Sequence, residues 1–134
     1  MLTVKDLKTY FYTDAGCAKA VDGISFSVQK GKVLGIVGES GCGKSVLCKS
    51  ILHLLPPSAR RKSGTIAVNG RDITRLRERE LQKLRGSLFS MVFQDPMTAL
   101  NPSMTIGAQI AEAVRVHDRK APREAVSARV EELM

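Results

Sequence analysis

A glycine-rich segment that ends in a lysine and a serine has the residue types and spacing of a phosphate-binding loop. It reads Gly38-Glu39-Ser40-Gly41-Cys42-Gly43-Lys44-Ser45 and matches G-x-x-x-x-G-K-[ST] at every fixed position. Glycines let the backbone curl without a Cβ clash, so that consecutive N–H groups can converge on phosphate oxygens. The pattern predicts that Lys44 reaches the terminal phosphates of a nucleoside triphosphate and that Ser45 ligates Mg²⁺.

Such a loop is meaningful only between a buried strand and a helix, and the sequence predicts both. Residues 33–37 are almost continuously apolar, as expected for a core strand covered on both faces within a parallel sheet. After the loop, apolar residues recur at helical spacing until Pro56-Pro57 stops the helix; they are Leu47, Ile51, Leu54 and Leu55. A glycine-rich turn that merely joined a strand to a helix would not need an inward-facing lysine.

The N-terminal part has the pattern of an antiparallel sheet. Residues 20–29 alternate apolar and polar side chains, which predicts a half-buried strand. Residues 65–69 repeat this pattern and run into Asn69-Gly70, a turn pair, while residues 2–7 can add a third strand. Residues 88–93 are apolar throughout most of their length and are predicted as another buried strand.

Helices are predicted between and after these strands. Residues 75–85 are expected to form a surface helix closed by Gly86. Two amphipathic helices should follow, the first marked by Ile106, Ile110 and Val114 and the second by Val126, Val130 and Leu133. The second reaches Met134 without a stop signal, so we expect the chain to be cut inside a helix.

The composition is that of an ordinary soluble globular protein with an excess of positive charge. The hydrophobic fraction is 43%, the charged fraction is 25% and the formal net charge is +8. Much of the excess lies in residues 60–62 and 71–85, where Glu78 and Glu80 interrupt it and no aromatic side chain offers a stacking platform. We interpret it as a solvated helix face, with contacts to anions as the alternative, and expect no nucleic-acid partner.

The cysteines and the apolar runs argue against a zinc protein, a disulfide-rich protein and a membrane-spanning protein. Cys17, Cys42 and Cys48 fit neither a zinc motif nor a disulfide framework, which favours a reducing compartment. No apolar run approaches the roughly 18 to 20 residues of a membrane span, and the N-terminus lacks a secretory core. Any role at a membrane therefore requires a partner.

Three segments of the sequence resemble the ATP-binding subunits of ABC importers of the oligopeptide/dipeptide (peptide/nickel) family. They are Ala20-Val21-Asp22-Gly23-Ile24-Ser25-Phe26, the loop at residues 38–45, and Met91-Val92-Phe93-Gln94-Asp95-Pro96-Met97-Thr98-Ala99-Leu100-Asn101-Pro102. The third is the most specific. The resemblance implies a truncated α/β fold over residues 1–134: an N-terminal antiparallel β layer and P-loop NTPase (ABC ATPase) core over 1–94, then the beginning of an α-helical subdomain over 95–134.

The resemblance also implies roles for residues outside the loop. Gln94 would be the glutamine that contacts Mg²⁺ and the attacking water, where the core meets the helical subdomain. A competing interpretation makes residues 89–93 a strand that ends in a Mg²⁺-holding Asp95, but the interposed Gln94 and the following Pro96 fit the first interpretation better. Lys44 and Gln94 are thus the expected catalytic residues, and Ser45 and Gln94 the expected metal ligands.

In the family an aromatic residue near the end of the first strand stacks on adenine. Tyr10, Phe11 and Tyr12 all occupy that region, and we favour Phe11 and then Tyr12. The expected cofactors are ATP and Mg²⁺. The expected ATP-binding residues are Gly38, Glu39, Ser40, Gly41, Cys42, Gly43, Lys44, Ser45, Phe11 and Tyr12.

The implied function is that of an ATP-hydrolysing subunit that powers an importer of peptides or related solutes. It would lie on the cytoplasmic face of the cell membrane as a peripheral protein. Its partners would be transmembrane permease subunits, a second ABC ATPase subunit and, indirectly, a periplasmic or extracellular solute-binding protein. The alternatives are a soluble ABC-type module that binds ATP for regulation, without a transporter, and a basic nucleic-acid-binding protein.

Several parts that the family needs for hydrolysis are missing from this sequence. It has no LSGGQ-type signature and no Walker B strand ending in Asp-Glu, and neither His53 nor His117 matches the family's switch histidine. We therefore expect a fragment that does not hydrolyse ATP by itself. The sequence leaves open the transported solute, whether the truncation is natural, and whether two identical or two different ATPase subunits pair.

Overall fold

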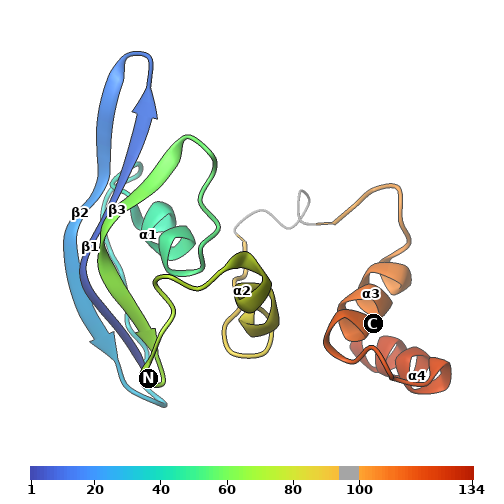
Figure 1. Ribbon diagram of the computed structural model, residues 1–134. Coiled ribbons are helices and arrows are strands. Elements are labelled where there is room, and N and C mark those ends of the chain that lie inside the picture. Colours follow the sequence, from blue (N-terminus) through green and yellow to red (C-terminus); the bar gives the residue numbers. More distant parts are fainter. Residues whose placement is uncertain (94–99) are drawn as a thin grey trace. The chain divides into compact units, whose positions relative to one another are not determined.

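The chain forms two compact units in the computed structural model, which describes residues 1–93 and 100–134. The first unit is Met1–Gln82 and the second is Lys83–Met134, so that the boundary falls within helix α2 (Glu78–Leu84). Figure 1 shows the sheet and helix α1 of the first unit, and helices α3 and α4 of the second. The predicted boundary at residue 94 lies outside the described residues.

The first unit is built on a four-stranded antiparallel sheet with the order β2-β1-β3-β4. Its strands are β1 (Leu2–Thr13), β2 (Gly16–Val28), β3 (Ala59–Val68) and β4 (Arg71–Asp72). The antiparallel layer predicted from the alternation is thus confirmed, although β1, β2 and β3 are longer than predicted. Asn69 and Gly70 join β3 to β4 with φ of 49° and 80°, as a two-residue hairpin turn requires.

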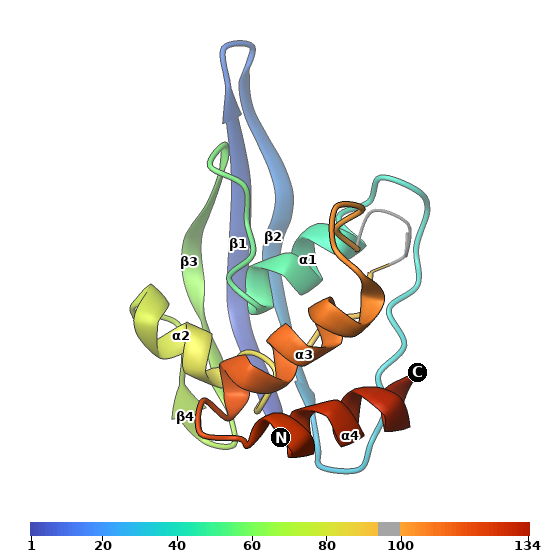
Figure 2. The ribbon, with the colours of Figure 1, turned by 90° about the vertical axis from the view of Figure 1, so that its right-hand side faces the viewer.

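Helix α1 (Lys44–Ile51) packs on one face of this sheet against β1 and β2 (Figure 2). Leu47 of α1 is buried together with apolar side chains of the sheet and of the segments that follow α1 and β4. These buried residues are Val4, Leu7, Val21, Leu52, Ala59, Ile66, Ile73 and Leu81. The phosphate-binding motif therefore enters a helix that is fixed by an apolar contact with the sheet.

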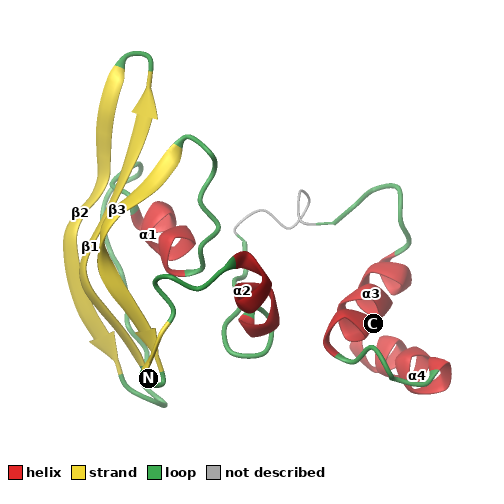
Figure 3. Ribbon diagram, in the orientation of Figure 1, coloured by secondary structure: helices red, strands yellow, loops and turns green. Residues whose placement is uncertain are grey.

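The two predicted core strands are absent from the described part of the chain. Residues 33–37 form no strand, and Val33 and Val37 are 98% and 96% exposed; Figure 3 shows the stretch from β2 to α1 as loop. Between residues 88 and 93, Phe89 makes only an isolated bridge with Arg85, and Val92 is 95% exposed. A buried parallel strand needs hydrogen-bonded neighbours, and the described residues provide none for either segment.

The helix after the loop is shorter than predicted. Helix α1 ends at Ile51 rather than before Pro56-Pro57, because His53 takes a left-handed φ of 56° and its N–H turns back to the carbonyl of Ser50. Helix α2 likewise covers only Glu78–Leu84 of the predicted 75–85, and Gly86 follows with φ of 83°, as expected for a helix end.

Part of the basic stretch lies on a strand rather than on a solvated helix face. Residues 60–62 belong to β3, and the guanidinium of Arg61 is half buried. It donates to the ring of His53 and to the carbonyl oxygen of Thr74. Burial lowers the pKa of Arg61, so this cation is partly withdrawn from the solvated surface.

The second unit contains a pair of packed helices, α3 (Ile106–His117) and α4 (Arg123–Leu133). Both helices are confirmed close to their predicted positions. The hydroxyl of Thr105 caps α3 by accepting the N–H of Ala108 at 3.3 Å, and Val126 of α4 is buried. Among the described residues, no helix is both long enough and apolar enough to cross a membrane.

A tyrosine, an aspartate and a lysine interact on the β1–β2 hairpin. The hydroxyl of Tyr10 donates to Asp22 Oδ1 at 2.7 Å, and Lys19 Nζ lies 5.7 Å from the centre of the Tyr10 ring. The bond to Asp22 raises the pKa of Tyr10 to about 12 and lowers that of Asp22. This contact stabilises the hairpin while Tyr10 is protonated and Asp22 is ionised. Its contribution is therefore lost as the pH rises from 10 toward 12, and it is also lost in acid as Asp22 becomes protonated.

We expect this pKa to be visible in an alkaline absorbance titration of the Tyr12→Phe variant, in which Tyr10 is the one remaining tyrosine. Tyr10 should titrate at about pH 12. Adding Asp22→Ala should move the titration back toward the ordinary value of 10.0, whereas Asp14→Ala in the hairpin turn should not. A midpoint near 10 with Asp22 in place would show that the hydrogen bond does not form.

Candidate nucleotide-binding site

The motif at residues 38–45 leads directly into the N-terminus of α1. Gly43 is the N-cap residue and has no side chain to cap the helix, and the first turn contains no acidic residue. The first N–H groups of a helix have no partner within it, and the helix dipole adds positive potential there. This end of α1 is therefore suited to hold an anion.

Glycine is required at particular positions of the loop for conformation and for space. Gly41 and Gly43 have φ of 82° and 96°, in the left-handed region. A Cβ on Gly43 would lie 2.3 Å from the carbonyl oxygen of Ala20 in β2, and one on Gly38 would lie 2.7 Å from Cys42 Sγ. The loop is thus tightly curled, and a side chain at either position would collide with its surroundings.

Lys44 bends back over the loop that precedes it. Its Nζ donates to the carbonyl oxygens of Gly38 and Glu39 at 2.7 and 2.6 Å, and it lies 3.5 Å from Cys42 Sγ. An ammonium has three donors and sulfur is a weak acceptor. Two strong bonds therefore hold the charge over the loop, and a phosphate oxygen can replace the third, weak contact with a much stronger one.

The predicted metal ligands are only partly within the described residues. Ser45 lies in the first turn of α1 with an exposed side chain, and its hydroxyl oxygen is the kind of donor that Mg²⁺ accepts beside phosphate oxygens and water. Gln94 lies outside the described residues. In the described part of the chain, no group of three or more His, Cys, Asp or Glu residues could hold a metal ion.

The register of β1 separates the aromatic candidates. From Thr9 to Phe11, β1 pairs residue for residue with β3, so side chains alternate between the two faces of the sheet. Thr9 contacts Ser50 of α1, so Phe11 shares the face on which α1 lies, and it is half-buried. Tyr10 and Tyr12 occupy the opposite face by the same alternation. The arrangement favours Phe11 over Tyr12 as the adenine platform.

Two contacts between the sheet and the loop–helix segment were not predicted from the sequence. A buried hydrogen bond joins Thr9 of β1 to Ser50 of α1. A β-bulge in β2 leaves Ala20 unpaired between Val21 and Lys19, and the carbonyl of Ala20 lies against Gly43. For Ser50 a signal existed, since it stands three residues after Leu47 and hence on the same, buried side of the helix.

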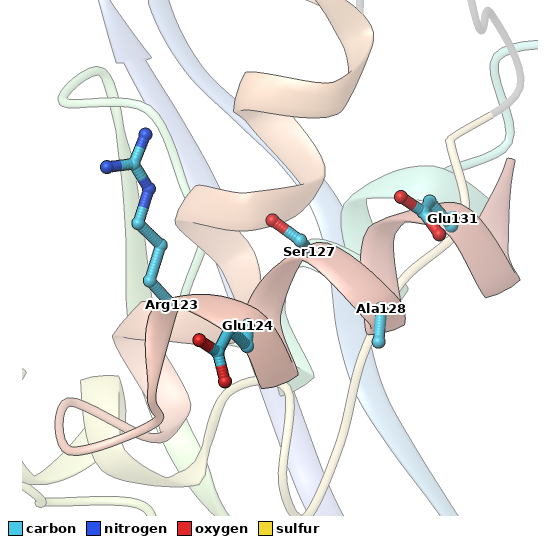
Figure 4. Close-up of a pocket in the computed structure, with 5 residues that line it drawn as sticks. All are labelled: Arg123, Glu124, Ser127, Ala128 and Glu131. Atoms are coloured by element: carbon cyan, nitrogen blue, oxygen red, sulfur yellow. The ribbon is translucent and has the colours of Figure 1, made fainter.

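A surface hollow in the second unit is a poor alternative site. Its lining residues all come from α4 and are exposed, and they are drawn in Figure 4: Arg123, Glu124, Ser127, Ala128 and Glu131. The hollow combines two carboxylates with one guanidinium and contains no glycine-rich backbone. The two carboxylates would repel a triphosphate, and one exposed guanidinium does not offset them.

Comparisons with known proteins identify relatives of the chain and its fold. The chain is 47% identical to a probable peptide ABC transporter ATP-binding protein of Sinorhizobium fredii, over 99% of this chain and 40% of that relative. It is also 47% identical to a dipeptide transport ATP-binding protein of Bacillus subtilis, over 93% of this chain and 38% of that relative. The chain thus spans about two fifths of the length of these relatives.

Solved structures and a family match complete the comparison. An ATP-binding cassette solved as a dimer in a post-hydrolysis state with ADP and Pi is 22% identical, with a TM-score of 0.81 over 98% of this chain and 55% of that chain. The fold is therefore that of an ATP-binding cassette, an α/β fold present here in part. The family described as ABC transporter matches residues 21–134, and the chain belongs to this family.

Proposed function

We propose that this chain carries the nucleotide-binding part of a subunit that hydrolyses ATP to power the import of peptides or related solutes. The observation that carries the proposal is the position of Lys44, held over a curled glycine loop at the uncapped N-terminus of α1. A buried or covered turn would not need a cation there, whereas a triphosphate needs both the cation and the free N–H groups.

The nucleotide would be bound by groups from two elements. Backbone N–H groups of residues 38–45 and the Lys44 ammonium would hold the phosphates, and Phe11 of β1 would stack on the adenine. Ser45 and Gln94 are the proposed ligands of Mg²⁺, which supplies charge neutralisation at the phosphate oxygens when bound. These residues bind and orient the nucleotide.

Peptides as the transported solute, and the partners, are inferred from the relatives. Two of them are called peptide and dipeptide transport ATP-binding proteins, and the similar cassette was solved as a dimer. We propose that transmembrane permease subunits and a second ATPase subunit bind the whole protein at the cytoplasmic face of the membrane. A separate solute-binding protein would deliver the solute.

The 134-residue chain by itself is expected to release no phosphate from MgATP above the level of its Lys44→Ala variant. Hydrolysis needs a group that orients water and compensation of the charge on the transferred phosphoryl group. The signature segment, the Walker B acids and the switch histidine that would supply these are not in this sequence.

This expectation is tested by measuring phosphate release from MgATP by the purified chain and by its Lys44→Ala variant. Light scattering should first show that each preparation is monomeric. The monomer check matters because Val33, Val37 and Val92 are nearly fully exposed and invite association. Robust release that vanished in Lys44→Ala would show that the chain already contains a complete catalytic site, contrary to the proposal.

A further inference from the structure

A buried polar contact connects the two elements that would hold the two ends of the nucleotide. Thr9 Oγ1 and Ser50 Oγ lie 2.8 Å apart, and both residues are 0% exposed. Thr9 belongs to β1 and Ser50 to the last turn of α1. The two residues are 41 positions apart in the sequence, so local chain geometry does not hold them together.

The direction of this hydrogen bond follows from the neighbouring one. Ser50 Oγ also lies 2.6 Å from the carbonyl oxygen of Val46, which can only accept. A serine hydroxyl has a single proton, so Ser50 donates to Val46 and Thr9 donates to Ser50. The pair is therefore ordered, with the threonine of the strand as donor and the serine of the helix as acceptor.

The Thr9–Ser50 pair lies on the same two elements as the proposed adenine platform and the phosphate loop. Phe11 follows Thr9 by two residues on the same face of β1. Lys44 precedes Ser50 by six residues along α1, a rise of about 9 Å at 1.5 Å per residue. Between β2 and α1 the chain forms no regular structure, so the placement of α1 relative to β1 depends on contacts across the sheet face.

Apolar contacts alone fix this placement poorly. Leu47 buries its side chain against the sheet, but hydrophobic burial is non-directional and tolerates small shifts of the helix. A hydrogen bond between two buried hydroxyls has a narrow range of length and angle, and breaking it leaves the threonine donor without a partner. The Thr9–Ser50 bond is thus a directional contact between α1 and β1.

We propose that the Thr9–Ser50 hydrogen bond is a positioning contact that sets the spacing between the adenine platform at Phe11 and the phosphate loop at residues 38–45. This inference rests on the proposed nucleotide site. If the bond has this role, it controls how much the adenine base adds to the affinity that the triphosphate alone has for the chain. The affinity of the phosphate loop for a triphosphate without a base should change little.

The test compares two ligands by calorimetry, MgATP and magnesium tripolyphosphate, which lacks the base. For Thr9→Val, which keeps the shape of the side chain and removes the donor, we expect MgATP affinity to fall about threefold to tenfold, the equivalent of one net hydrogen bond. Tripolyphosphate affinity should change by less than about twofold on the same scale. Thr9→Ser should restore the wild-type ratio, and Thr65→Val, an exposed threonine on β3, should not alter it.

Two further variants make the outcome specific. In a Phe11→Ala background the ratio should no longer respond to Thr9→Val, because the base then has no platform whose position matters. The double variant Thr9→Val/Ser50→Ala removes both partners and leaves no unpaired donor, so it is expected to fold even if Ser50→Ala alone does not. It should show the same reduced ratio as Thr9→Val.

Equal losses for both ligands, or an unchanged ratio in both Thr9→Val and the double variant, would overturn the inference while leaving the nucleotide site intact. Equal losses would mean that the pair holds only the phosphate loop. If the wild-type chain bound neither ligand, the proposed function itself would be wrong, and the inference would fail with it.

Discussion

The Lys44→Ala variant is expected to bind MgATP about 10-fold to 150-fold more weakly than the wild type. The estimate corresponds to one charge-assisted hydrogen bond of about 1.5 to 3 kcal/mol. Lys44 is the cation that two loop carbonyls hold in place. Removing it leaves the phosphates with the backbone N–H groups and the bound Mg²⁺, and with no cationic side chain of the loop. Isothermal titration calorimetry on variants with unchanged circular dichroism spectra measures this loss.

Lys49→Ala is the matched control, because it removes the same charge from the last turn of the same helix. It should leave MgATP affinity within about twofold of the wild type, since a partly exposed charge at the far end of the helix interacts weakly with the ligand through water. If Lys44→Ala and Lys49→Ala weakened binding equally, general charge rather than the loop would account for the affinity.

The second large effect is expected for Gly43→Ala, in the absence of nucleotide. The substitution places a Cβ 2.3 Å from the backbone carbonyl of Ala20 and also forces a left-handed φ of 96° on alanine. Gly41→Ala imposes a similar φ of 82° in open space, which should cost about 1 to 2 kcal/mol of unfolding free energy. Gly43→Ala should cost about 1 to 3 kcal/mol more, the range for overpacking.

Urea denaturation of Gly41→Ala, Gly43→Ala and the control Gly35→Ala separates backbone strain from the steric clash with Ala20. Gly35 has neither a positive φ nor an atom within 4 Å of an added Cβ, so this variant should change stability by no more than about 1 kcal/mol. Equal destabilisation by Gly41→Ala and Gly43→Ala would mean that backbone strain alone acts, and that Ala20 does not press against the loop.

Local patterns were sufficient to predict the antiparallel layer, the loop and the helices of the second unit. Residues 65–69 alternate around Ile66, which is fully buried. The alternation of residues 20–29 also marks a strand, although Ile24 is exposed and Phe26 and Val28 are only half-buried. The loop motif is equally local. Thr105, the cap of α3, directly precedes the predicted helix.

Features that depend on distant partners could not be predicted in this way. Residues 33–37 are apolar enough for a core strand, yet a strand exists only where neighbours pair with it. The adenine platform stays a prediction among Tyr10, Phe11 and Tyr12. The pairing of β1 with β3, which determines the face that each of these side chains occupies, is not visible in the local sequence. The bulge at Ala20 and the bond between Thr9 and Ser50 are likewise properties of pairing and packing, not of local sequence.

The most direct test of the claim that residues 38–45 bind the triphosphate is an NMR titration of the ¹⁵N-labelled chain with MgATP. The largest saturable shifts should occur at the backbone amides of Gly41, Gly43 and Lys44, because these N–H groups would bond directly to phosphate oxygens. Amides of α4 should not move, and Lys44→Ala should require far more nucleotide for the same shifts. Saturable shifts confined to α3 and α4, or titration curves identical in Lys44→Ala and the wild type, would contradict the assignment of the loop as the nucleotide site.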